Sequence, residues 1–285
     1  MKQLTEWECR SLSSRMRWIG DVPKLRRETG LCTGLLVAIH TQDLRRYVIR
    51  NYWKMKALAP RLAGRWRAGE TIERLARKRS FPPIAIARIV ASEIGVSKAD
   101  FRKMVNCVEI EHELPRDHRR LASEVAKAVK HDYMDSPWSL RIYRELGREG
   151  ERILSEWLEE HGIAFETEKE QRGGLGVPTP DFLFSSPQKI DGVENVSWIE
   201  SKAFFGDLQH IRRHYRRQVS RYEQRYGDGM IVYWYGVSKE AGEEGPIRQF
   251  LDPSIFEDRP GMRRLQEEVP SKLVTGAVKG SDQIS

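Results

Sequence analysis

The sequence predicts an α/β core in the order helix, three strands, helix, strand, preceded by an all-α domain. The 285 residues suggest two domains of roughly 150 residues each. The apolar pattern also changes near residue 131, from helical spacing to short runs of β-branched and aromatic residues. We therefore expect a basic helical domain over residues 1–130, a core domain over 131–256 and a mobile tail over 257–285.

Two patterns organise the helical domain. The first predicts a helix whose apolar side is buried, with charged residues opposite, and consists of Leu35, Leu36, Ile39, Leu44, Tyr47, Val48 and Trp53. The second is a helix over Thr71–Arg79, a turn, and a helix over Ile84–Ile94 that Pro82 and Pro83 can open. This order is typical of a helix-turn-helix over 71–95, although basic helical hairpins are common. Its candidate DNA-contacting residues are Arg77, Lys78, Arg79 and Arg88.

The core domain is predicted from alternating helix and strand patterns. Helices are expected over Leu140–His161 and about 208–226, the second with Asp207 as its N-cap. The expected strands are Ile163–Thr167, Thr179–Phe184, Val196–Ala203 and Met230–Tyr235. Turn-rich connections are expected at Gly173–Gly176 and Ser185–Asn195.

Charge is unevenly distributed along the chain. The net charge is +8, yet residues 1–130 hold 28 Lys and Arg against 14 Asp and Glu, whereas the remainder holds 21 against 27. A basic domain suits a polyanion such as nucleic acid, and an acidic one suits metal-dependent chemistry. The alternative is a chain that is rich in arginine without a nucleic-acid partner.

Several protein classes are excluded on sequence grounds. The longest apolar runs, Leu31–Ile39 and Ile84–Ala91, are far shorter than the ~20 residues that cross a bilayer. The first residues lack the apolar segment of a secretory signal. Three widely spaced cysteines favour neither a disulfide framework nor a zinc ribbon. We expect a reducing compartment: the cytoplasm of a prokaryote, or the nucleus and cytoplasm of a eukaryote.

Three residues of the core domain indicate phosphodiester chemistry. Asp181 begins an apolar strand, where an acid is costly unless it is paired or bound to metal. Glu200 and Lys202 are two residues apart and therefore share one face of their strand. The strands of Asp181 and Glu200 could pair as a hairpin and bring both carboxylates around Mg²⁺ or Mn²⁺. Lys202 could then activate a water and stabilise charge on a phosphate. Taken singly, Asp181 could be a turn cap, and the Glu-x-Lys alternation could be a solvated face.

The two helices of the core domain offer further candidates. Glu151 lies on the flank of the apolar face formed by Ile153, Leu154, Trp157 and Leu158, whereas Glu149 points largely away from it. Alternatively, Glu151 is a first-turn Glu that the helix dipole favours. On the later helix, Gln218 borders the apolar stripe of Ile211, Tyr215, Val219, Tyr222 and Tyr226. Tyr222 and the arginines Arg212, Arg213, Arg216 and Arg217 could follow a phosphate backbone, or the arginines could be an ordinary solvated face. His210 and His214 lack an evident third ligand for a transition metal.

The order Glu151, Asp181, Glu200-Ser201-Lys202, then Gln218-x-x-x-Tyr222, resembles the PD-(D/E)xK nuclease superfamily. More narrowly, the residues resemble the TPD-motif family, which includes the codanin-interacting nucleases of animals. The motifs that carry this resemblance are Thr179-Pro180-Asp181-Phe182, Trp198–Ala203, Phe205-Gly206-Asp207 and Val232–Gly236. It covers residues 140–240 and extends thinly into the helical domain. It implies a restriction-endonuclease-like core, with Asp181 and Glu200 as metal ligands and Lys202 as the catalytic lysine.

We therefore expect a Mg²⁺- or Mn²⁺-dependent nuclease, acting on DNA more readily than RNA, whose helical domain grips the substrate. One alternative is a helix-turn-helix regulator with a catalytically silent nuclease-like domain. Another is a protein-interaction adaptor. The regulator's scaffold domain would have no need for Asp181, Glu200 and Lys202 together with Gln218.

Overall fold

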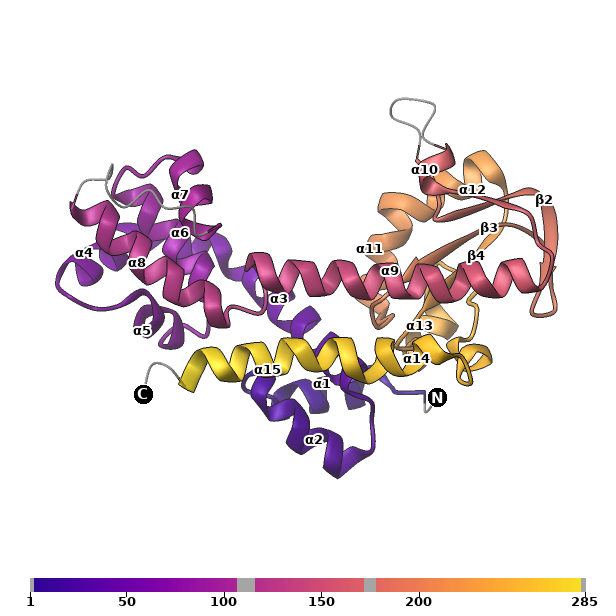
Figure 1. Ribbon diagram of the computed structural model, residues 1–285, viewed down its shortest axis with the longest axis horizontal. Helices are drawn as coiled ribbons and strands as arrows, with labels where there is room; N and C mark the ends of the chain where they lie inside the picture. The colour runs from indigo at the N-terminus through magenta and orange to yellow at the C-terminus, as the bar shows by residue number, and fades with distance from the viewer. Residues whose placement is uncertain (1–2, 107–115, 172–177, 283–285) are drawn as a thin grey trace. The chain divides into compact units, whose positions relative to one another are not determined.

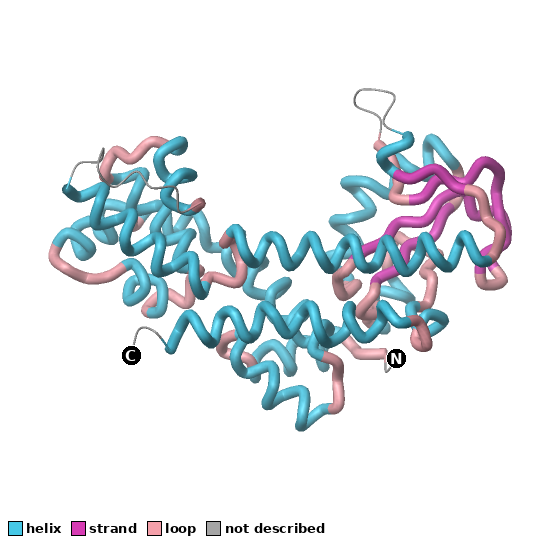
Figure 2. Tube along the Cα trace, viewed as in Figure 1, coloured by secondary structure: helices cyan, strands magenta, loops and turns pink. Residues whose placement is uncertain are grey.

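The computed structural model describes residues 3–106, 116–171 and 178–282 (Figures 1 and 2). Contacts divide the chain into two compact units. The sheet unit comprises Met1–Arg17, Pro23–Ile39 and Arg144–Pro270, and the helical unit comprises Trp18–Val22, His40–Tyr143 and Ser271–Ser285. Both units thus combine segments that are distant in sequence, which replaces the predicted division at residue 130. The expected turn at Gly173–Gly176 lies outside the described residues.

Between residues 3 and 131, the described residues form helices and no strand, which agrees with the expected all-α character. The α-helices are α1 (Glu6–Arg15), α2 (Val22–Thr29), α3 (Thr33–Ala57), α4 (Ala59–Arg67), α5 (Ile72–Arg77), α6 (Pro83–Glu93), α7 (Lys98–Val105) and α8 (Arg116–His131). Later helices are α9 (Pro137–Glu160), α10 (Glu168–Gln171), α11 (Leu208–His214), α12 (Ser220–Tyr226), α13 (Lys239–Glu244), α14 (Pro260–Arg263) and α15 (Val269–Asp282). None of the described helices is long and apolar enough to cross a membrane.

A four-stranded mixed sheet forms the centre of the sheet unit. Its strands are β1 (Phe165–Thr167), β2 (Phe182–Ile190), β3 (Val193–Lys202) and β4 (Gly229–Tyr233), in the spatial order β1-β2-β3-β4. The first three are antiparallel neighbours, and β4 runs parallel to β3. The α/β core and all four predicted strands are therefore confirmed, with shifted ends.

The hairpin between β2 and β3 is longer than predicted. Ser185–Asn195 was expected as a turn-rich connection, but only Asp191 and Gly192 form the turn between the paired residues Ile190 and Val193. Both turn residues have positive φ, 47° and 80°. Asp-Gly is one of the dipeptides favoured in a tight two-residue hairpin turn, and the strands extend up to it on both sides.

Helices pack on the sheet through the apolar faces that the sequence predicts. Ile211, Val219 and Tyr222 are buried against Trp198 of β3 and Ile231 of β4. The α11–α12 segment lies beside the strands in Figure 2. On α9, the predicted face is likewise buried at Ile153, Leu154 and Leu158. Gly150 is required there, because a Cβ atom would lie 2.2 Å from the Trp234 indole nitrogen.

The first residues of the chain belong to the sheet unit. A Glu6 carboxylate oxygen accepts hydrogen bonds from the Leu208 amide and the Ser238 hydroxyl, both at 2.7 Å. In addition, the Lys239 amide donates to the Leu4 carbonyl at 2.9 Å. The start of α11 is thus tied to α1, which a linear domain boundary does not anticipate.

The tail predicted to be mobile is helical in the structure. It contains α14, a π-helical turn over Arg264–Glu268, and α15. Leu265, Val269 and Leu273 are fully buried. Their spacing of four residues is the missed signal, because it places them on one side of a helix.

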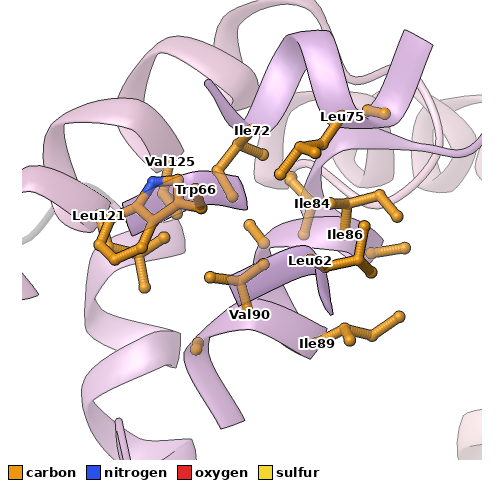
Figure 3. Close-up of a cluster of buried hydrophobic side chains, with 14 of the residues drawn as sticks. Leu62, Trp66, Ile72, Leu75, Ile84, Ile86, Ile89, Val90, Leu121 and Val125 are labelled. Atoms are coloured by element: carbon orange, nitrogen blue, oxygen red, sulfur yellow. The ribbon is translucent and has the colours of Figure 1, made fainter. Parts of the chain in front are cut away.

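The helical unit has its own hydrophobic core, built by α4 to α8. Trp66, Ile72, Ile84 and Leu121 are fully buried in it, and Figure 3 shows them converging with their neighbours. The predicted helix-turn-helix pattern appears as α5 and α6, with Pro83 opening α6 as expected. Ser80, in the connecting turn, has a positive φ of 50°.

One buried acid fixes the start of α6. Asp132 is 2% exposed, and its carboxylate accepts hydrogen bonds from the amides of Ile84, Met134 and Asp135 at 3.1, 2.9 and 2.8 Å. Asp132→Ala should lower the free energy of unfolding by about 3 kcal/mol, because these donors would lose their acceptor in or near the core. Denaturant unfolding checks this. Asp100→Ala, which removes a partly exposed acid in the first turn of α7, is the control; equal losses for both variants would contradict the account.

Candidate active site

Asp181 and Glu200 are brought together by the pairing of β2 with β3. Phe182 pairs with Ile199, so the residues just before and just after them, Asp181 and Glu200, are neighbours across the strands. The Asp181 amide donates to a Glu200 carboxylate oxygen at 3.2 Å, and the Ser201 amide donates to the Asp181 carboxylate at 2.8 Å. The predicted hairpin geometry of the two acids is confirmed.

Lys202 completes this group from the same strand as Glu200. Its Nζ forms an ion pair with Glu200 Oε1. Glu200 is 2% exposed, while Lys202 is half-buried. The ammonium and both carboxylates therefore share one largely desolvated place at the ends of β2 and β3.

Burial dominates the electrostatics of this group. It raises the pKa of Glu200 to about 7; Lys202 opposes the shift, and Asp181 adds to it. The pKa of Asp181 is raised for the same first reason and is opposed by Lys202. Burial alone would lower the pKa of Lys202, but Glu200 and Asp181 outweigh it, so the net shift is upward. The lysine is thus held protonated beside two acids that resist being charged together.

Glu151 belongs to the same electrostatic group. It is exposed on α9, and loss of hydration is the largest cause of its raised pKa. Repulsion from Asp181 raises that pKa further, and Lys202 lowers it. The structure therefore places Glu151 near the pair, as predicted. Glu149 differs from its prediction: it is 8% exposed and pairs with Arg152 at 2.7 Å.

Glu168 is a fourth acid at the site and was not among the residues predicted from sequence. It raises the pKa of both Asp181 and Glu151. Its amide donates to the Asp181 carbonyl at 3.2 Å, which fixes its place at the end of β1. The sequence did place Glu168 directly after the first strand. In an antiparallel pair, the end of one strand lies beside the beginning of the next, where Asp181 stands.

A π-helical turn interrupts the helix predicted over 208–226. It covers Tyr215–Val219 and follows His214, whose Nδ1 lies 2.8 Å from the Tyr233 hydroxyl. His214 Nε2 lies 4.0 Å from Glu200 Oε1. Burial lowers the pKa of His214 to about 3, which keeps the ring neutral. The Gln218 side chain opposes this shift. Gln218 is therefore close to the site through His214, and π-turns are frequent at functional sites.

Tyr222 has a different place from the one predicted. It is 2% exposed, so it offers no surface to a nucleic acid. Its hydroxyl donates to the Thr179 carbonyl at 3.0 Å, and the Tyr226 hydroxyl donates to the Pro178 carbonyl at 3.1 Å. Both tyrosines hold the segment that leads into Asp181, which corrects the predicted contact role for Tyr222.

The four predicted arginines of this helix are all exposed: Arg212, Arg213, Arg216 and Arg217. Within the described part of the chain, none of them forms an ion pair with a carboxylate. Asp207 caps the helix as predicted, accepting from the His210 amide at 2.8 Å. A basic surface thus adjoins the buried acids without being neutralised by them.

Asp181 and Glu200 are the pair that could hold a divalent cation. Among the described residues, no group of three or more His, Cys, Asp or Glu side chains is arranged to hold a metal ion. A cation held by these two carboxylates would have its remaining positions open to water or substrate. This suits Mg²⁺, which retains several waters and commonly binds through one or two carboxylates.

The predicted DNA face of the helical unit is less available than the sequence suggests. A recognition helix needs three or four side chains that reach base edges. In α6, the exposed residues are Arg88, Ser92 and Glu93, and most of the others are buried. Arg88 also lies over the Phe101 ring at 5.8 Å. The helical hairpin is present, but its second helix is a central packing element.

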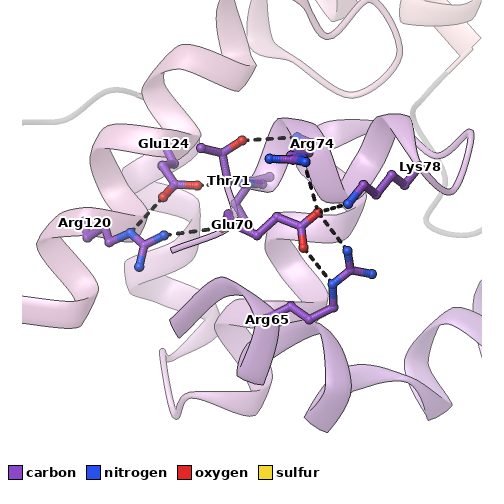
Figure 4. A network of polar contacts seen from close by, with 8 residues as sticks. Arg65, Glu70, Thr71, Arg74, Lys78, Arg120 and Glu124 are labelled. Atoms are coloured by element: carbon purple, nitrogen blue, oxygen red, sulfur yellow. Dashed lines mark hydrogen bonds and ion pairs between the residues drawn. The ribbon is translucent and has the colours of Figure 1, made fainter. Parts of the chain in front are cut away.

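The cations on and next to α5 also form ion pairs with carboxylates. Glu70 contacts Arg65 at 2.6 Å and Lys78 at 2.7 Å, and Arg77 pairs with Glu73 at 2.8 Å. Figure 4 shows Glu70 at the centre of this network, with Arg74 close to it. Arg79 is half-buried, and its carbonyl accepts from the Tyr47 hydroxyl at 3.3 Å. Two of the four predicted phosphate contacts are thus already paired.

Residues 117–250 match the model of a family described as "Protein of unknown function TPD sequence-motif". This region carries the TPD motif of that family. The family resemblance seen in Thr179-Pro180-Asp181 and the surrounding motifs is thereby confirmed. No solved structure gives a significant match to the chain.

Curated relatives match the same part of the chain. A protein named "CDAN1-interacting nuclease 1" from Xenopus tropicalis is 35% identical over 120 residues, which is 42% of this chain and 39% of the relative. The protein of that name from Homo sapiens is 33% identical over 120 residues, 42% of each chain. The one from Danio rerio is 32% identical over 120 residues, 42% of this chain and 40% of the relative. The match thus spans about two fifths of the relatives' length.

Proposed function

We propose that this protein is a metal-dependent nuclease with a restriction-endonuclease-like core of the PD-(D/E)xK type. The observation that carries the proposal is the meeting of Asp181 and Glu200 across two strands with Lys202 in contact with Glu200. The printed names of the relatives, which call them nucleases, support it.

The chemistry of the acidic pair fits a hard divalent cation. Two carboxylates with raised pKa values share a desolvated place with one lysine, so a further positive charge would stabilise their ionised forms. We propose Mg²⁺ or Mn²⁺, which when bound would supply an activated water and neutralise charge on the scissile phosphate. Asp181 and Glu200 would hold it.

The other residues of the site have roles that follow from their positions. Lys202 is protonated and held by Glu200, so it can orient the attacking water and stabilise negative charge on a phosphate oxygen. Glu151 lies beside the two carboxylates, because it interacts electrostatically with Asp181. Gln218 lies beside them through its interaction with His214. The exposed arginines Arg212, Arg213, Arg216 and Arg217 would bind the phosphate backbone, because the described carboxylates leave them unpaired.

DNA is the proposed substrate, with the basic helical unit contributing to its binding. The competing hypothesis, a non-catalytic DNA-binding regulator, makes the opposite prediction for a cleavage assay. A fragment starting near Asp132 is unsuitable for such tests, since it would lack α1, whose Glu6 holds the start of α11. The full chain should be used.

The full-length protein should cleave at least one labelled substrate among single-stranded, duplex and branched DNA and RNA, and only with Mg²⁺ or Mn²⁺ added. Gel electrophoresis of the labelled products checks this. Binding without cleavage of any of these substrates, in either metal, would favour the regulator and contradict the nuclease.

A further inference from the structure

The outer face of α3 in the helical unit is a basic surface without acids. The segment Leu44–Ala57 contains three arginines and two lysines and no Asp or Glu. Among the described residues, Arg50, Lys54 and Lys56 form no ion pair, in contrast to the cations of α5. Their charges are therefore available to a polyanion.

Large apolar side chains lie on the same face as these cations. Ile49 is 51% exposed and Trp53 is 73% exposed. Ile49, Trp53 and Lys56 are spaced four and three residues apart, so they adjoin one another on the helix surface. The sequence pattern predicts Trp53 on the buried side, but the structure buries Met55 instead.

Trp53 is held in place although it is exposed. Lys56 Nζ lies 5.2 Å from the centre of its ring, and the Tyr52 ring meets it edge-on at 6.3 Å. One turn and a half earlier, Tyr47 is 36% exposed and packs edge-on against Phe81. The indole is therefore a positioned, accessible ring with a cation beside it, which differs from a single hydrophobic residue scattered on a surface.

We propose that this face of α3, comprising Ile49, Arg50, Trp53, Lys54 and Lys56, binds unpaired nucleotides. A base stacks on Trp53, and the flanking phosphates contact the three cations. The proposal rests on the proposed function only in taking nucleic acid as the partner. It names the substrate class as a single strand, or a single-stranded part of a branched molecule.

Duplex nucleic acid would use only half of this surface. Its phosphates could contact Arg50, Lys54 and Lys56, but its bases are stacked on one another and offer no face to Trp53. A single strand offers both phosphates and base faces. The apolar part of the surface is small and ringed by charge, so it suits one stacked base better than insertion into a lipid layer.

The test measures binding to the full-length protein in EDTA, where cleavage is blocked. Fluorescent oligothymidine and oligouridine of about 20 nucleotides, and a duplex of the same length, are titrated by anisotropy at about 50 to 200 mM salt. Trp53→Ala removes the ring. Trp7→Ala is the matched control, because Trp7 is 70% exposed but lies on α1 in the sheet unit.

Trp53→Ala should weaken binding of the single strand about fivefold or more, with less than a twofold change for the duplex and an unchanged salt slope. Trp7→Ala should leave all three affinities unchanged. Arg50→Gln, a second exposed variant, should reduce the salt slope on the single strand by about 0.7. Similar losses on oligothymidine and oligouridine would show recognition of unpaired bases in general, and a loss on only one would name the preferred nucleic acid.

Equal single-strand affinity for Trp53→Ala and Trp7→Ala, at matched melting temperatures, would overturn the proposal. An equal loss on single strand and duplex would do the same, because it would reduce Trp53 to a general contact. If metal-dependent cleavage persists while Trp53 has no effect, this inference fails alone. If no substrate is cleaved but single-strand binding depends on Trp53, the inference stands and the nuclease proposal fails.

Discussion

Lys202→Ala is expected to lower the cleavage rate by about 100-fold or more, on the order of 3 kcal/mol in the barrier. The ammonium is protonated and held against Glu200, so it can act on the water and phosphate at the site. It is one cation among many for the polyanion, so substrate affinity should change no more than about threefold. Single-turnover rates and binding titrations with the same oligonucleotide check both parts.

The matched control for this variant is Lys189→Ala. Lys189 is an exposed lysine near the far end of β2 and pairs with Glu194. It should cleave at the parent rate. Melting curves are needed for both variants, since Lys202 also offsets the charges of Asp181 and Glu200. A folded Lys202→Ala protein that cleaves as fast as Lys189→Ala would show that the Glu-x-Lys pattern has no catalytic meaning.

Glu200→Gln is expected to reduce cleavage by about 1,000-fold at ordinary Mg²⁺ concentrations, because one of two protein ligands for the cation is lost. A melting curve is needed here too, because Glu200 offsets the charge of Lys202 while burial of Glu200 opposes its ionised form. Excess Mn²⁺ should restore part of the rate to Glu200→Gln and none to Lys202→Ala.

Cleavage rates over a Mn²⁺ titration, together with a melting curve, test this expectation. Glu194→Gln, an exposed acid at the beginning of the same strand, is the control and should behave as the parent protein does. Full activity of Glu200→Gln would contradict the assignment of this carboxylate to the metal. A large drop in its melting temperature would show a structural role instead.

The placement of the acidic pair could be predicted from sequence because it depends on local pairing. Asp181 and Glu200 flank one hairpin, and the strand alternation that puts Glu200 and Lys202 on one face is a property of any strand. The tight turn at Asp191-Gly192 begins the hairpin, but the register shifts twice between this turn and the acids. That dipeptide was visible in the sequence, although the strands on either side were predicted too short.

Features that depend on contacts between distant segments could not be predicted in this way. Nothing near Glu6 in the sequence shows that it holds the start of α11, and nothing near Tyr222 shows that its hydroxyl donates to the Thr179 carbonyl. Glu168 approaches Asp181 only because β1 pairs with β2. The helical spacing near Trp53 was read correctly as a helix, but which side faces the core depends on the neighbouring helices.

We propose that phosphodiester cleavage requires a cation held by Asp181 and Glu200. The most direct measurement follows one cleavage reaction of the full-length protein in Mg²⁺, adds EDTA part-way, and then adds Mg²⁺ in excess. Cleavage should stop with EDTA and resume with Mg²⁺. Cleavage that continues undiminished in EDTA would contradict this requirement.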